Sequence, residues 1–138
     1  LALGGKNDPA FGGGPLTLTG RIMCLSDGAY RGDGPMLGGL DRTWGRMAVF
    51  RVGGTDILVV TERDQMLDRQ QFYPFGIDPA AKKVLALKSM QHFRAAFEPI
   101  AGRVIVCDSG ALSTPKMSRR PYQRVKRPIW PLDAETTF

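Results

Sequence analysis

The chain has 138 residues, of which 43% are hydrophobic and 23% charged, a length and balance that suit one soluble domain with a modest core. No apolar run approaches the roughly 20 residues of a membrane-spanning helix, so we expect no membrane partner. The first residues include no initiator methionine and no signal pattern, which favours a fragment or a processed product. The only cysteines are Cys24 and Cys107, which we interpret as small buried side chains in a reducing cytoplasm. A bridge between them in an oxidising compartment stays open.

The formal net charge of +6 is concentrated in one segment. Residues 116–127 contain six basic side chains and no acidic one, which gives this segment a charge of +6. Asp133 and Glu135 contribute −2, so residues 1–115 carry a net charge of only +2. Tyr122 and Trp130 near this patch superficially fit base stacking. The prolines of the same stretch and the weak charge elsewhere instead favour a tail that docks on its own protein, so we expect no nucleic-acid partner.

The first half of the chain predicts strands separated by glycine-rich loops. Alternating apolar residues over 15–24 predict a half-buried strand. The turn formers of 27–46 predict long loops or an irregular hairpin. Two apolar runs rich in β-branched residues, 47–52 and 56–61, flank Gly53-Gly54-Thr55 and form a strong hairpin signal.

The second half predicts short helices. Asp68 is an N-cap candidate for a helix that ends near residue 73, and Asp78 with Pro79 predicts a second one through residue 82. A third helix is expected over 92–100, with Pro99 ending or kinking it. Its apolar stripe consists of Phe93, Ala96, Phe97 and Ile100.

Two continuous apolar runs, 84–87 and 104–107, predict strands buried on both faces. The order from residue 57 to 108 is then strand, helix, strand, helix, strand, which favours parallel pairing. We therefore expect an α/β or α+β fold, in which a β-hairpin region is followed by a β-α-β-α-β unit. These elements would form a mixed sheet flanked by helices, with long Gly/Pro loops and an irregular C-terminal tail.

We expect a single domain over residues 1–138. Within it, residues 1–115 would form the folded core. Residues 116–138 would form a basic, Pro-rich docking tail, whose apolar stretch 128–132 we expect to pack on the protein.

The segment 88–94 is the best candidate for a site, because it joins a predicted strand to a predicted helix, where ligands bind in open α/β sheets. Free backbone N–H groups at a helix start favour anions, and Lys88 and Arg94 add positive charge. His92, the only histidine, is suited to act as a general acid or base or to donate to an oxyanion. Capping or packing at the helix start is the structural alternative for His92.

Other candidates lie outside that segment. Arg63 follows a predicted strand end and would face the same cleft. The glycines of Gly4-Gly5-Lys6 lack the final Lys-Ser/Thr pair of a phosphate-binding loop, so they indicate backbone that passes close to a ligand or another domain. A zinc site needs three or four protein ligands. One histidine without clustered acids or thiols does not supply them, so we expect this chain alone to bind no metal.

Seven motifs occur in order along nearly the whole chain: residues 4–9, 34–39, 45–49, 65–68, 76–79, 88–97 and 127–133. Together they resemble the C-terminal domain of the microcystinase C (MlrC) family, and the Lys88-Ser89…His92-Phe93-Arg94 block is the most specific of them. The resemblance implies a hydrolase, a zinc-dependent peptidase or amidohydrolase of bacterial type that acts on peptides or small amides. It further implies that the zinc ligands lie in a preceding N-terminal domain.

Within such a protein, this chain would form one wall of an interdomain cleft. Lys88, Ser89, His92 and Arg94 would face the substrate, and the N-terminal metal-binding domain would be the partner. The alternatives are a non-catalytic ligand-binding module and a docking domain that shapes a homo-oligomer.

Overall fold

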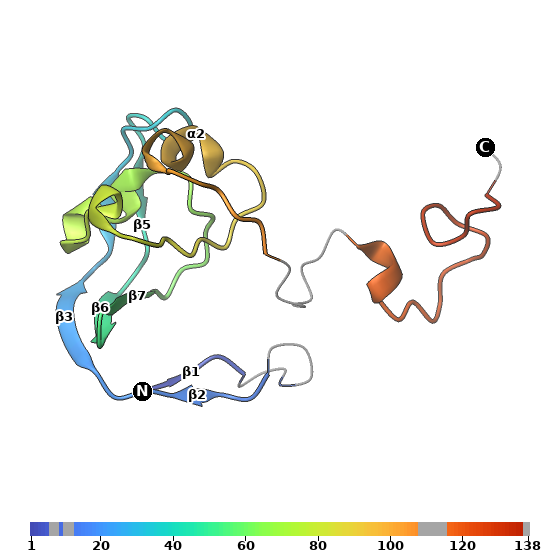
Figure 1. The fold of residues 1–138 in the computed structure, drawn as a ribbon, viewed down its shortest axis with the longest axis horizontal. Coiled ribbons are helices and arrows are strands. Elements are labelled where there is room, and N and C mark those ends of the chain that lie inside the picture. The colour runs from blue at the N-terminus through green and yellow to red at the C-terminus, as the bar shows by residue number, and fades with distance from the viewer. Residues whose placement is uncertain (6–8, 10–12, 108–115, 137–138) are drawn as a thin grey trace. The chain divides into compact units, whose positions relative to one another are not determined.

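The computed structural model describes residues 1–5, 9, 13–107 and 116–136. The chain divides into two units, which we call the core unit (Leu1 and Leu18–Ile105) and the terminal unit (Ala2–Thr17 and Val106–Phe138). Short strands and short helices make up both units (Figure 1). Among the described residues, no helix has both the length and the apolar character that crossing a bilayer requires.

The core unit contains a three-stranded antiparallel sheet in the order β3 (Arg21–Ser26), β6 (Met47–Val52), β7 (Thr55–Val59). The β6–β7 hairpin confirms the prediction from the two runs around the glycine pair. Gly53 has a φ of +56°, a conformation in which an L side chain would be strained, so glycine is favoured at this turn.

The single strand predicted over 15–24 is wrong in its continuity. The structure forms β2 (Leu16–Thr17), which pairs with β1 (Ala2–Leu3) in the terminal unit, and β3, which pairs with β6 in the core unit. The ladder of β3 shifts register between Ile22 and Cys24. Because this irregularity breaks the period-two alternation, Ile22 is 49% exposed rather than buried.

The turn-rich segment 27–46 forms an irregular hairpin, as predicted. Its strands β4 (Ala29–Arg31) and β5 (Asp41–Thr43) are antiparallel. The loop between them is closed by backbone hydrogen bonds from the Gly32 amide to the Leu40 carbonyl (2.9 Å) and from the Gly39 amide to the Gly32 carbonyl (2.8 Å).

Three single-turn 3₁₀ helices follow the sheet: η1 (Arg69–Gln71), η2 (Tyr73–Phe75) and η3 (Pro79–Ala81). Both predicted N-caps are confirmed, because the Asp68 side chain accepts from the Gln70 amide and the Asp78 side chain accepts from the Ala80 amide, each at 2.9 Å. The helix predicted over 92–100 is shorter than expected. It consists of α2 (Arg94–Phe97) and the 3₁₀ turn η4 (Glu98–Ile100), which contains Pro99. In the terminal unit, η5 spans Met117–Arg119.

The predicted β-α-β-α-β unit is not formed by the described residues, in which every strand pair is antiparallel. The segments 84–87 and 103–107 belong to no strand, and Val84 is 81% exposed. Cys107, which we expected to be buried, is an exposed free thiol, and Cys24 is half-buried. An apolar run specifies extended backbone, whereas a strand also needs a neighbour to pair with. The fold remains a mixture of strands and helices of the predicted α/β or α+β kind.

A core of aromatic and aliphatic side chains holds the sheet, the irregular hairpin and the helices together. Trp44 and Val49 are its most buried apolar members. Tyr30 packs against Trp44 at 5.9 Å between ring centroids, and Phe72 meets Phe97 edge-on at 5.9 Å. The predicted stripe of the third helix is confirmed, because Ala96 and Phe97 are buried and its two flanking members pack against the core.

Candidate functional site

The loop 88–94 lies at the surface of the core unit. Lys88 and His92 are exposed, and Ser89 is half-buried. α2 is a single turn of four residues, so the helix-start argument for anion binding loses its basis. The N-cap position of α2 is Phe93, without a side-chain cap, so the alternative that His92 caps this helix is wrong.

The structure also connects this loop to the chain segment after β7. The Ser89 hydroxyl lies 3.5 Å from the Gln65 side-chain oxygen, a long contact at the limit of a hydrogen bond. Arg63 is exposed and stands two residues before Gln65. The contact therefore brings the segment that carries Arg63 next to the loop of Ser89.

Arg94 is less available than Lys88. Its guanidinium pairs with the Glu98 carboxylate at 2.9 Å, one helical turn away, and lies 5.5 Å from the centre of the Phe93 ring. Arg94 and Glu98 line a surface hollow of about 510 Å³ together with Ala95 and Pro99. An anionic ligand at Arg94 would have to compete with Glu98.

The glycines near the N-terminus belong to the terminal unit. Gly4 and Gly5 have φ values of +67° and +57°. A Cβ on Gly5 would lie 2.3 Å from the Gly13 carbonyl oxygen, so the close backbone approach is to the chain's own residues. Lys6 lies outside the described residues.

Throughout the described residues, no three side chains of His, Cys, Asp or Glu are grouped closely enough to hold a metal.

The sequence did not reveal two buried polar clusters of the core unit. Asp68 is fully buried and accepts hydrogen bonds from the amides of Asp33 (3.1 Å) and Gly34 (2.7 Å), which anchor the β4–β5 loop. Gln71 is equally buried, and its side-chain oxygen accepts from the amides of Leu67 (2.6 Å) and Asp68 (2.9 Å). The motif positions 34 and 68 were visible in the sequence, but nothing in it showed that they touch.

Tyr30 contributes a third buried polar group. Its buried hydroxyl has no hydrogen bond of good geometry among the described residues, although the side chains of Arg42 and Gln71 lie near it. Burial raises the pKa of this phenol. No sequence signal marked this residue.

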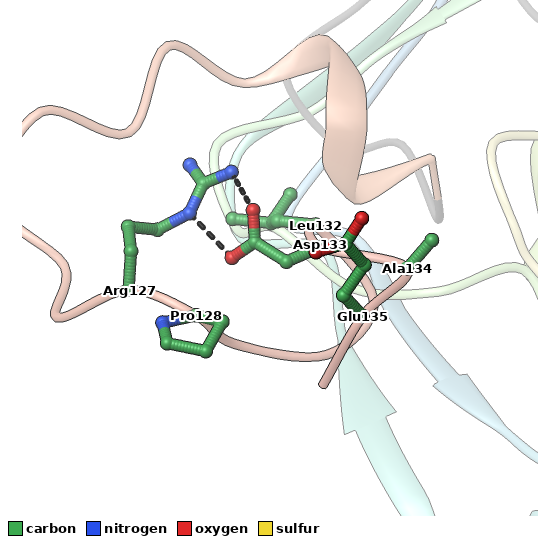
Figure 2. Close-up of a pocket in the computed structure, with 6 residues that line it drawn as sticks. All are labelled: Arg127, Pro128, Leu132, Asp133, Ala134 and Glu135. Carbon is green, nitrogen blue, oxygen red and sulfur yellow. Dashed lines mark hydrogen bonds and ion pairs between the residues drawn. The ribbon is translucent and has the colours of Figure 1, made fainter. Parts of the chain in front are cut away.

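A turn in the terminal unit is closed by an ion pair (Figure 2). The guanidinium of Arg127 donates through Nε to Asp133 Oδ2 at 2.5 Å and through a second nitrogen to Oδ1, and the Ile129 amide donates to Oδ2 at 2.7 Å. These bonds, that of Arg127 first, hold the pKa of Asp133 below its usual value. The pair lines a second hollow of about 510 Å³, while Trp130 is 62% exposed. The docking of residues 128–132 stays a prediction.

The fold is a mixture of short strands and short helices, with an exposed polar loop at residues 88–94. The chain belongs to the MlrC C-terminus family, whose sequence profile matches residues 1–124. Microcystinase C from Sphingomonas sp is 32% identical over 133 residues, which cover 96% of this chain and 24% of that protein. The predicted resemblance is thereby confirmed, and the chain spans about a quarter of the length of this curated relative.

Proposed function

We propose that this chain forms one wall of the interdomain substrate cleft of an MlrC-like zinc-dependent peptidase or amidohydrolase. Membership of the MlrC C-terminus family carries the proposal, because the match extends over nearly the whole chain. The zinc ligands would lie in a preceding N-terminal domain, and the zinc would polarise the scissile carbonyl. The two free thiols fit a cytoplasmic location.

The loop 88–94 supplies the groups that would face a peptide or a small amide. Lys88 is exposed and is not paired with any acid among the described residues, so its ammonium is suited to bind a substrate carboxylate. His92 is exposed and makes no hydrogen bond in the described part of the chain, which leaves its imidazole free to donate to a developing oxyanion. Arg94 would reinforce Lys88 only after leaving Glu98.

The first test is hydrolysis of a linear peptide by the full-length parent protein. Replacing His92→Ala should lower kcat by roughly 100-fold if the imidazole stabilises the oxyanion. The exposed neighbour provides a matched control, since Gln91→Ala should leave kcat unchanged. Thermal unfolding of both variants should equal that of the wild type, because neither side chain is buried.

The outcomes separate the alternatives. Unchanged kinetics in His92→Ala would show that this residue does not stabilise the oxyanion. A wild-type parent that binds peptides without hydrolysing them would favour a non-catalytic ligand-binding module. Loss of a multimer on deleting residues 116–138 would favour the oligomerisation role.

A further inference from the structure

In the described part of the chain, the backbone of segment 84–87 forms no hydrogen bonds. It follows η3, precedes Lys88 and belongs to no strand. Among the described residues, none of its amides or carbonyls has a hydrogen-bond partner. Backbone polar groups in folded proteins are almost always paired with protein or water, and an open apolar edge is a template for another strand.

The side chains of this segment already have the arrangement of a strand. Leu85 and Leu87 are half-buried and pack against the core, whereas Val84 and Ala86 are exposed. Alternation with a period of two places successive side chains on opposite faces, as in a sheet. One face therefore packs on the core, the opposite face is exposed, and the backbone edges have no hydrogen-bond partner among the described residues.

We propose that residues 84–87 are a β-strand completed by a strand from the remainder of the longer polypeptide, in the manner of β-strand addition. The inference rests on the proposed function, since it takes the preceding domain as the partner. Lys88 and Ser89 follow the segment directly. Pairing would thus place the cleft-facing loop at the end of a strand shared with the metal-bearing domain.

Interface size favours a tethered occupant over a second copy of this chain. Four residues offer few hydrogen bonds and little apolar area, whereas stable interfaces between separate proteins bury about 1,200 Å² or more. A strand on the same polypeptide needs much less, because the tether raises its effective concentration to the order of millimolar. The curated relative leaves room for such a strand, since this chain matches only 24% of its length.

The test compares hydrogen exchange of the amides of 84–87 in this chain alone and in the full-length parent. We expect unprotected exchange in the isolated chain and, in the parent, exchange slowed on the order of 100-fold. Ala86→Pro removes one amide donor without touching the core face, so it should restore fast exchange at the neighbouring amides of the parent. The matched control Ala86→Ser keeps the amide and should keep the protection.

Several results would overturn the inference. Equal exchange in both proteins would show that no strand is added, and slow exchange in a monomeric isolated chain would show pairing within it. Protection that rises with the concentration of the isolated chain would indicate a second copy. Protection that persists in Ala86→Pro, with the unfolding temperature of the wild type, would exclude backbone pairing.

Hydrolysis separates this inference from the proposed function. A parent that protects 84–87 but hydrolyses no peptide contradicts the function alone. A parent that hydrolyses peptides while 84–87 stay unprotected contradicts the strand alone.

Discussion

At the scale of single residues, Asp56 joins the β6–β7 hairpin to the end of η3. Its side chain is only 5% exposed and accepts from Arg51 at 2.6 and 2.9 Å and from Lys82 at 2.7 Å. The hydrogen bonds from Arg51, followed by that from Lys82, lower the pKa of Asp56 to about 2.

This lowered pKa makes part of the folding stability depend on pH. In the unfolded chain the pKa of an aspartate is about 3.9, so the folded state favours the ionised form. The resulting stabilisation is present above about pH 4 and is lost as the pH falls towards 2. We expect about 1–2 kcal/mol at neutral pH, because the partly exposed cations are screened by solvent.

The measurement is urea unfolding of the wild type and Asp56→Asn between pH 2 and 7. The difference in free energy of unfolding should shrink on acidification. Asp41→Asn is the control. Asp41 pairs with Arg31, but the two side chains are 79% and 67% exposed, so this ion pair should contribute almost nothing to the free energy of unfolding. A difference for Asp56→Asn that does not change with pH would contradict the assignment.

Asp68 should matter more for stability than an ordinary helix cap. Besides capping η1, its carboxylate accepts the amides of Asp33 and Gly34, and Asp68→Ala would leave all these donors unpaired. We expect a loss of about 3 kcal/mol in the free energy of unfolding, against about 1 kcal/mol for Asp78→Ala, the exposed cap of η3. Denaturant midpoints measure both, and equal losses would show that the loop contacts contribute nothing.

At the scale of elements, features that depend on neighbouring residues could be predicted from the sequence, whereas contacts between residues far apart in the chain could not. The two aspartate caps and the glycine turn of the β6–β7 hairpin depend on neighbours within a few residues, and the structure confirms them. The bond between Asp68 and Gly34 spans 34 residues and leaves no periodic trace in the sequence. The apolar run 84–87 predicted a paired strand, but pairing depends on a partner that no run of residues specifies.

The turn closed by Arg127 and Asp133 is the element for which docking can be measured. The Trp44 indole is buried and donates to the Gln71 carbonyl at 3.3 Å, whereas Trp130 is exposed within its own unit. If the tail docks, a soluble paramagnetic agent should broaden the Trp130 indole N–H signal less in this chain than in a peptide of residues 116–138. Trp130→Phe assigns the two signals, and equal broadening in chain and peptide would contradict docking.

At the scale of the whole molecule, most motifs that carry the family resemblance build structure. Gly34 meets Asp68, Asp78 begins η3, and Arg127 pairs with Asp133. The exposed part of the block 88–94 has no such explanation in the described contacts, and it is where the proposed chemistry lies. The candidate site was predicted from a strand-to-helix junction, from residue chemistry and from the resemblance. The junction is not formed, because residues 84–87 belong to no strand, so residue chemistry and the resemblance are what now support the site.

The β6–β7 turn has a practical consequence. A Cβ on Gly54 would meet nothing within 4 Å, and Gly54 does not share the positive φ of Gly53. A cysteine at this position, in a chain whose exposed Cys107 is replaced by serine, offers a thiol for a fluorophore or a spin label. The hairpin thus provides an attachment point from which distances to the terminal unit of this chain can be measured in solution.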